Sequence, residues 1–262
     1  MDLDFNIHLS SKWLLDRQHV ETNLSAKEIA VLIAISSYAI PGFNKDEEYI
    51  FTHPIHVNDI VSRLSGNKIN DRNGRKVKDV NLAINKLVLL DLITLRKYND
   101  SGYNIFLIHK PTITDFGFFT EIPNKVFEQL KREGNKPSVF YNLLAVYATI
   151  AASSMKIKNA DHIDSERNHY LYLSRSLYKG RTDHLGSLST IGNSEKTIKL
   201  IKQLVEMGLI VAKYGVHFVN GQPQGRILYT TIPGNEMWLD EYIEYELKSG
   251  VIKQVYHVDP LM

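Results

Sequence analysis

The sequence of 262 residues contains no cysteine. This absence excludes disulfide bonds, thiolate metal sites and thiol nucleophiles, and it is typical of proteins in a reducing compartment. No apolar run reaches the roughly 20 residues that a membrane-spanning helix requires. The opening residues, MDLDF, carry acids where an export signal has a basic region before an apolar stretch. We therefore expect a cytoplasmic protein that does not contact a membrane.

The chain also has little net charge, +2 at neutral pH, but this charge is unevenly distributed. Residues 56–110 hold ten Lys or Arg against five Asp, and residues 174–231 hold eight against three acids, so each range carries +5. The remainder is acidic. Clustered positive charge is typical of proteins that bind a polyanion, since neutralising phosphates releases counterions. Two solvated basic faces without a partner are the alternative interpretation.

The two basic ranges belong to a sequence repeat with a separation of 117 residues. Five residues of 33–40 recur in 150–157, and five residues of 84–93 recur in 201–210. An unbroken register across two separate elements indicates one module used twice.

The length is sufficient for two domains of about 100 to 130 residues, each with its own core. We expect a first domain at residues 1–112 and a second at 113–234. An acidic, aromatic tail follows at 235–262.

Each copy predicts the same order of elements: an apolar helix, a second helix, an amphipathic helix and a β-hairpin. The first apolar helix ends before Pro41, and its counterpart runs from 138 to about 155. A second helix is predicted at 57–64, whereas the later range, 174–190, is interrupted by glycines. The hairpins are expected at 94–98 with 103–109, and at 211–219 with 226–232.

The third helix of each copy has the clearest periodicity, with one apolar side and one polar side. The predicted core stripes are Val77, Val80, Ile84, Leu87 and Val88 in the first copy, and Ile198, Ile201, Leu204 and Val205 in the second. Cationic side chains lie on the other sides. In the second copy Gly192 and Ser194 provide a tight approach and a capping residue, so this helix start presents free backbone amides to an anion.

The sequence SEKTIKLIKQLVEMGLI, at 194–210, resembles the recognition helix and first wing strand of bacterial winged helix-turn-helix proteins. The pattern IPNKVFEQL followed by FYNLLAVYATIAAS is similar to the opening of winged-helix modules in plasmid and phage replication initiators and replisome organisers. The resemblance implies a mainly α fold with small β wings, that is, an α+β protein with two winged helix-turn-helix domains in tandem. The first copy departs from the pattern at 66–74, where a polar loop replaces the tight turn, which puts its base reading in question but not its phosphate binding.

Together, the resemblance and the clustered charge give the candidate contacts to double-stranded DNA. Base edges or adjacent phosphates would be met by Ser194, Lys196, Thr197 and Lys199 in the second copy, and by Arg75, Lys76, Lys78 and Asn81 in the first. The wings would bring Arg96, Lys97, Lys213, Gln222, Gln224 and Arg226 to the backbone or the minor groove. Lys68, Arg72, Arg181 and Lys202 complete the expected set.

No constellation in the sequence indicates catalysis, a cofactor or a metal. Residues 192–197, GNSEKT, lack the glycine directly before lysine that a phosphate-binding loop needs. The five potential ligands in 161–169 match no metal-site spacing, and Pro54 forbids a helix that would align His53 with His56. Among the 14 tyrosines none has an evident metal or electrophilic partner that would make it a nucleophile. We expect a protein that is not an enzyme.

Two basic reading surfaces on one chain predict a DNA site that spans two successive grooves or two half-sites. The entry pattern and the duplication favour a plasmid or phage replication initiator, which the resemblance implies would bind origin repeats and recruit replication proteins. A transcription regulator of the same architecture and a winged-helix module that binds other proteins are the alternatives. Residues 235–248 interleave acidic and aromatic side chains. They are expected to pack on their own domain, or to dock replication proteins or a second copy of the chain.

Overall fold

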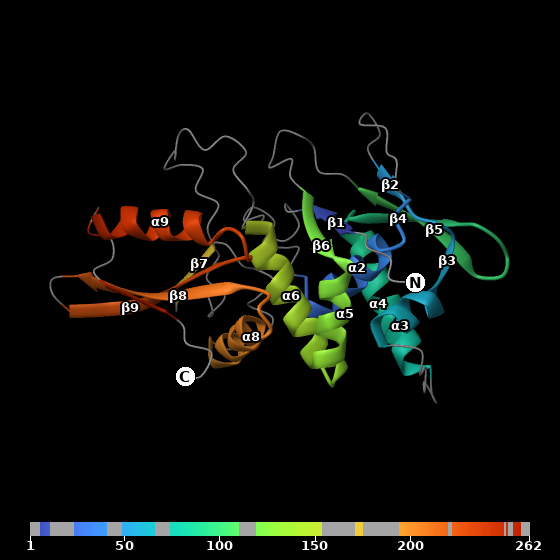
Figure 1. Ribbon diagram of the computed structural model, residues 1–262. Coiled ribbons are helices and arrows are strands. Elements are labelled where there is room, and N and C mark those ends of the chain that lie inside the picture. The colour runs from blue at the N-terminus through green and yellow to red at the C-terminus, as the bar shows by residue number, and fades with distance from the viewer. Residues whose placement is uncertain are drawn as a thin grey trace. The chain divides into compact units, whose positions relative to one another are not determined.

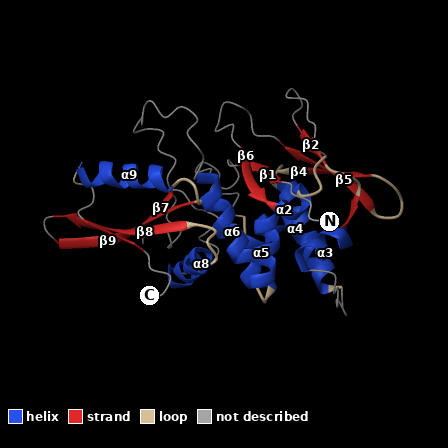
Figure 2. Ribbon diagram, viewed as in Figure 1, coloured by secondary structure: helices blue, strands red, loops and turns tan. Residues whose placement is uncertain are grey.

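The computed structural model describes residues 6–10, 24–40, 49–65, 74–109, 119–153, 171–174, 194–219, 222–248, 250 and 254–257. Within these residues seven helices combine with small antiparallel sheets, which confirms the α+β class (Figure 1, Figure 2). The chain divides into two compact units, with described residues 6–145 in the first and 146–257 in the second. In the described part of the chain, no helix combines the length and the apolar character needed to cross a membrane.

At the centre of the first unit lies α2 (Ala26–Ser36), which is buried on every side from Ile29 onward. A capping box begins this helix: the Ser25 hydroxyl accepts from the Glu28 N–H at 3.4 Å, and the Glu28 carboxylate accepts from the Ser25 N–H at 2.6 Å. Two backbone donors that the first turn leaves open are thereby satisfied. The helix is uniformly apolar because α3 (Val57–Ser65) and α4 (Arg75–Leu89) both pack against it.

The α4 helix is amphipathic, as its periodicity predicts. It buries Val80, Ala83, Ile84 and Leu87. The prediction that Val88 belongs to the core is wrong, since this side chain is exposed. The chain turns just after it, and Leu92, which is buried, fills that end of the core instead.

A small sheet closes the first unit around its central strand, β5 (Tyr103–His109). The strand β4 (Ile93–Lys97) pairs with one edge of β5 as an antiparallel hairpin. The other edge pairs with β2 (Tyr49–Phe51) at residues 107–109 and with β3 (Ile55–His56) at 103–104. The predicted hairpin is therefore present, with its first strand one residue earlier than expected.

A second strand pair brings the segment after residue 118 into the first unit. β1 (Asn6–Ser10) pairs antiparallel with β6 (Phe119–Pro123), which leads directly into α5 (Asn124–Glu133). The two units divide within the next helix, α6 (Pro137–Ser153), whereas the predicted boundary lies at 112–113. Between α5 and α6 the chain passes so closely that a Cβ at Gly134 would lie 2.7 Å from the Cα of Phe140.

The second unit is built around a four-stranded sheet with the order β10-β8-β9-β7. Its strands are β7 (Leu171–Ser174), β8 (Val211–Val219), β9 (Gln222–Thr231) and β10 (Gln254–His257). The predicted second hairpin is present, with β9 beginning at Gln222 rather than at 226.

Two helices flank this hairpin in the sequence. The helix α8 (Ser194–Glu206) precedes it, and α9 (Glu236–Lys248) follows it. Leu239 and Ile243 of α9 are buried, and this helix packs against β9. The acidic tail thus packs on its own domain, as the first of the two expectations has it.

The separation of 117 residues found in the sequence recurs in the geometry of α4 and α8. The buried residues of α8 are Thr197, Leu200, Ile201 and Leu204, which lie 117 positions after the four buried residues of α4. Thr197 and Leu200 are absent from the predicted stripe, and Ile198 and Val205 are only half buried. The core-facing side of the helix is therefore the same in both units: Ile84 and Leu87 recur as Ile201 and Leu204, whereas Val80 and Ala83 are replaced by Thr197 and Leu200.

The ends of these two helices agree bond for bond. In the first unit, backbone N–H groups of Leu90, Asp91 and Leu92 donate to the carbonyls of Lys86, Val88 and Leu87 at 3.0 Å each. In the second, Met207, Gly208 and Leu209 donate to Gln203, Val205 and Leu204 at 3.0, 2.8 and 2.9 Å. Both ends form a Schellman motif, with a positive φ of 55° at Asp91 and 67° at Gly208. Each helix is thus turned into its hairpin by the same local structure.

Candidate nucleic-acid interface

The exposed side of α8 carries two of the predicted contacts, Lys196 and Lys199, followed by Gln203 and Glu206. Residues three apart on a helix lie on the same side, so both ammonium groups project from the first half of the helix. No acidic side chain in the described part of the chain forms an ion pair with Lys199. Lys202 is half buried at the border of this side. The N-terminal half of α8 therefore presents a cationic surface within the described part of the second unit.

Two predicted contacts of the second unit do not fit this surface. Thr197 is only 1% exposed and belongs to the core side of α8, so its hydroxyl is out of reach of a base edge. Lys213, on β8, forms an ion pair with Asp240 of α9, and its own side chain is largely buried. Its charge is already neutralised within the unit. Neither residue therefore belongs to the cationic surface of α8.

The exposed side of α4 is cationic at its start and mainly apolar further along. Its first turn carries Arg75 and Lys78, both exposed, and Asn81 follows them. Beyond this point the exposed side is mainly apolar, since Leu82 is 58% and Leu89 84% exposed. Lys76 is half buried and engaged in further interactions within the unit. Only the start of α4 therefore offers cations to a ligand.

The hairpin of the first unit adds two more exposed cations, Arg96 and Lys97. Lys97 pairs with Asp100 across the turn at 2.6 Å, with both side chains in solvent. Arg96 has no ion-pair partner among the residues that the structure describes. In the second hairpin Gln222 is exposed.

Several predicted contacts lie outside the described residues, and the structure does not place them. They are Lys68, Arg72 and Arg181, together with the side chains of Ser194, Gln224 and Arg226. The polar range 161–169 and the second-helix range 174–190, apart from residue 174, also lie outside the described part of the chain.

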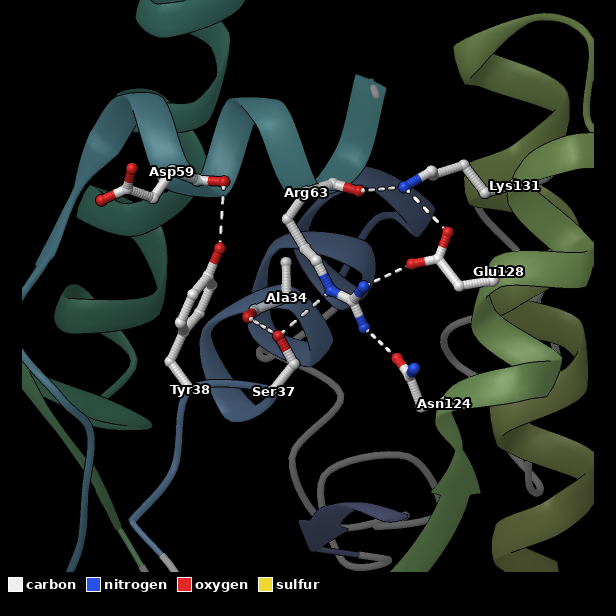
Figure 3. A network of polar contacts seen from close by, with 8 residues as sticks. All are labelled: Ala34, Ser37, Tyr38, Asp59, Arg63, Asn124, Glu128 and Lys131. Atoms are coloured by element: carbon white, nitrogen blue, oxygen red, sulfur yellow. Dashed lines mark hydrogen bonds and ion pairs between the residues drawn. The ribbon is translucent and has the colours of Figure 1, made fainter. Parts of the chain in front are cut away.

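One cation counted in the basic charge of the first unit, Arg63, serves the fold instead. Its guanidinium donates to the carboxylate of Glu128 and to the side-chain carbonyl of Asn124, and its Nε donates to the Ser37 hydroxyl at 3.3 Å (Figure 3). The same group lies 4.3 Å from the centre of the Phe127 ring. Burial lowers the pKa of Arg63, and the nearby carboxylate of Glu128 opposes this shift. Arginine remains charged across the physiological range, so this is a permanent ion pair.

The same network binds α5 to the rest of the first unit. Lys131 donates to the Arg63 carbonyl at 3.1 Å and pairs with Glu128 at 3.0 Å (Figure 3). On the other side of α3, the Tyr38 hydroxyl donates to the Asp59 carbonyl at 3.3 Å. Burial, and then the charge of Asp59, raise the pKa of Tyr38, which stays protonated as a donor. The contacts between Arg63 and α5 join residues more than 60 positions apart, so no local pattern predicts them.

The histidines of the first unit stabilise turns. The ring of His56 accepts at Nδ1 from the Asn58 N–H at 3.1 Å. His109 lies between Thr94, 2.8 Å from Nε2, and Asp91, 3.5 Å from Nδ1. Asp91 is almost fully exposed, so this chain of groups encloses no site for a substrate. Among the described residues, no three histidine or carboxylate side chains are grouped as metal ligands.

Comparisons with protein families, with characterised proteins and with solved structures gave no match to this chain.

Proposed function

We propose that the chain is a sequence-specific double-stranded DNA-binding protein built from two winged helix-turn-helix domains, and that it acts as a plasmid or phage replication initiator. In the first domain the order of elements from α2 onward is α2, β2, β3, α3, α4 and the β4–β5 hairpin, with β3 and β4 on either side of β5. In the second domain β7 and β8 likewise flank β9, and α8 precedes the hairpin. This shared arrangement supports the proposal, because a winged helix places its recognition helix directly before its wing.

The observation that carries the proposal is the exposed cationic side of α8. Its opposite side supplies Leu200, Ile201 and Leu204 to the core, so the helix is fixed while Lys199 is exposed. Lys196 is also exposed and takes part in a further interaction. Such a helix can enter a major groove with its first turns next to base edges and phosphates. We assign base reading to this helix.

The first domain would hold the duplex mainly by phosphate contacts. Arg75 and Lys78 at the start of α4, and Arg96 on the hairpin, are exposed cations that could make such contacts. Leucines occupy the exposed side of α4 further along, and they offer no hydrogen bond to a base edge. Phosphate binding without base reading agrees with the sequence before α4, where the polar loop at 66–74 replaces the tight turn of the winged-helix pattern.

A second candidate function for the first domain is protein binding through α4. The exposed Leu82 and Leu89 favour it, since large apolar side chains on one helix side are typical of interaction surfaces. Replacing both leucines by alanine would then abolish partner capture and leave DNA affinity within about twofold.

The DNA-binding proposal is tested by fluorescence anisotropy with duplexes selected from random DNA by the full chain. We expect tight binding to one selected sequence and a steep loss of affinity as salt rises. The variant Lys196→Ala/Lys199→Ala should bind at least tenfold more weakly. The slope of its log affinity against log salt concentration should be less steep by about two, because two phosphate contacts are lost. Its thermal unfolding should be unchanged, because both side chains lie off the core.

A charge-matched control removes two cations elsewhere, Lys125→Ala/Lys136→Ala, both of which are exposed. This control should bind the selected duplex within about twofold of the parent protein. Equal binding by the α8 double variant would refute the assignment of the recognition helix. Loss of plasmid or phage replication on deletion of the gene, with selected sites clustered at an origin, tests the initiator role; sites confined to promoters would contradict it.

A further inference from the structure

Three ring-bearing residues are neighbours in register at the open end of the first unit's sheet. In register, His56 is paired with Tyr103, and the Tyr98 N–H donates to the Tyr103 carbonyl at 2.9 Å. Residues directly opposite each other on antiparallel strands project to the same face. The rings of His56 and Tyr103 are 5.7 Å apart between centroids. We call these three residues the aromatic row.

The aromatic row is open to solvent at its tyrosines. Tyr98 is 59% and Tyr103 39% exposed, although large aromatic side chains usually contribute most of their area to a core or an interface. The hairpin extends away from the helices of its own unit, so none of these helices covers the tip (Figure 1). Packing within the unit therefore does not account for two neighbouring exposed tyrosines.

The turn beside the row is held in one conformation. The Asn99 side-chain oxygen accepts from the N–H groups of Ser101 and Tyr103, at 3.1 and 3.3 Å. Gly102 has a φ of 82°, which favours glycine, and a Cβ there would lie 3.1 Å from Nε2 of His56, so a side chain would require the histidine ring to shift. A surface that is already ordered loses little conformational entropy when it binds a flat ligand.

A cation completes this face of the hairpin. Arg96 lies two residues before Tyr98 on β4, and alternate residues of a strand project to the same side. Lys97 projects to the opposite side, where Asp100 pairs with it. The row thus combines flat ring faces with one guanidinium that can meet a phosphate.

We propose that the aromatic row and Arg96 bind unpaired bases of single-stranded DNA, by stacking on the tyrosines and by a phosphate contact to the arginine. This inference rests on the proposed DNA-binding function and extends it to a second form of the ligand. Stacking needs the face of a base, which a duplex hides between its neighbours, whereas a single strand exposes it. A tyrosine on a wing can also meet a duplex phosphate through its hydroxyl, so the test includes phenylalanine variants, which keep the ring and lose the hydroxyl.

The test uses the full chain and two labelled probes, a thymidine 12-mer and the selected duplex, each measured by anisotropy. The variant Tyr98→Ala/Tyr103→Ala should lose about tenfold or more in affinity for the thymidine 12-mer, since base–aromatic stacking contributes strongly to such affinity. It should keep its duplex affinity within about twofold. The matched control Tyr98→Phe/Tyr103→Phe keeps both rings and should bind both probes like the parent protein.

A direct readout is photo-cross-linking with 5-iododeoxyuridine placed in the 12-mer. We expect the cross-linked peptide to contain Tyr98 or Tyr103. Parent protein that binds the duplex but not the 12-mer would overturn this inference and leave the proposed function intact. Failure to bind either probe would overturn both. Equal loss of both probes in the alanine variant, or cross-links confined to other peptides, would also overturn it, and would point to a duplex contact or a protein-binding surface.

Discussion

The two helices α4 and α8 share one side and differ in the other. Their buried residues occupy the same positions at the separation of 117, and their C-terminal hydrogen bonds agree one by one. On the exposed side, Asp79, Leu82 and Asn85 of α4 stand where α8 has Lys196, Lys199 and Lys202. The common side builds the domain, and we expect the variable side to select the ligand of each domain. Duplication of a fold therefore does not imply duplication of its ligand.

The hairpins differ in a parallel way. The β4–β5 tip leaves two tyrosines and Arg96 exposed, whereas Lys213 of β8 is paired with an aspartate of α9. Among the described side chains of the two hairpins, Arg96 is thus available to a ligand and Lys213 is not. We expect the first hairpin to be the more active in binding.

The shared side gives the largest expected effect. Leu87 and Leu204 are both fully buried at matching positions, so Leu87→Ala and Leu204→Ala should each lower the free energy of unfolding by about 2 to 5 kcal/mol. Hydrogen exchange measured by mass spectrometry should show each loss in its own unit. A cost below about 1 kcal/mol at either position would break the equivalence of the two helices.

Arg63 comes next, because it has no counterpart in the repeat: position 180 is a glycine. Arg63→Met keeps an apolar contact to Phe127 but removes the hydrogen bonds to Glu128, Asn124 and Ser37. We expect a loss of about 2 kcal/mol in stability, smaller than for a fully buried pair since Glu128 can be hydrated. Arg132→Met on the exposed side of α5 should stay within about 0.5 kcal/mol. Chemical denaturation curves of the two variants show whether Arg63 stabilises the fold or behaves like an ordinary surface residue.

The Schellman motifs that end α4 and α8 give a smaller expected effect on stability. Gly208→Ala places a Cβ at a positive φ and should cost about 1 kcal/mol. Asp91→Gly relieves that conformation in the first unit and should be neutral or slightly stabilising, although it removes the contact to His109. Thermal unfolding checks both variants. Destabilisation by Asp91→Gly of more than about 1 kcal/mol would show that the aspartate side chain matters more than its backbone.

The smallest effect on stability is expected from exchanging residues of the exposed sides. Lys199→Leu gives α8 the residue of α4, and it should weaken duplex binding by about tenfold while changing the free energy of unfolding by less than about 0.5 kcal/mol. Leu82→Lys makes the reverse change and should strengthen duplex binding a few-fold, because it extends the cations of Arg75 and Lys78. Titrations with the selected duplex measure both. An unchanged affinity for the Leu82 variant would favour protein binding by α4.

The local pattern of the sequence predicted the elements well. The spacing of Val80, Ile84 and Leu87 identified α4, and the turn residues 99–102 located the first hairpin. Errors arose where the decisive factor lies far away in the chain. The ion pair of Lys213 depends on a helix that begins more than 20 residues later. Thr197 is a different case: it lies on the buried side of α8 by the same periodicity as Leu200, Ile201 and Leu204, but its polar residue type favoured a DNA contact.

The candidate site was predicted in part. Lysine at positions 196 and 199 could be assigned to an exposed side by periodicity alone. The aromatic row could not, because the register of β3 on β5 places His56 beside Tyr103 across a long stretch of sequence. Arg63 was counted among the free cations for the same reason, since its partners lie on α5.

Each Schellman end consists of backbone bonds within seven consecutive residues, so the direction in which the chain leaves the helix is set independently of the loop beyond it. We therefore expect that a hairpin tip can be exchanged between the units without changing this helix end. A chimera that carries the first tip after α8 should keep both its fold and the ligand preference of the transplanted loop.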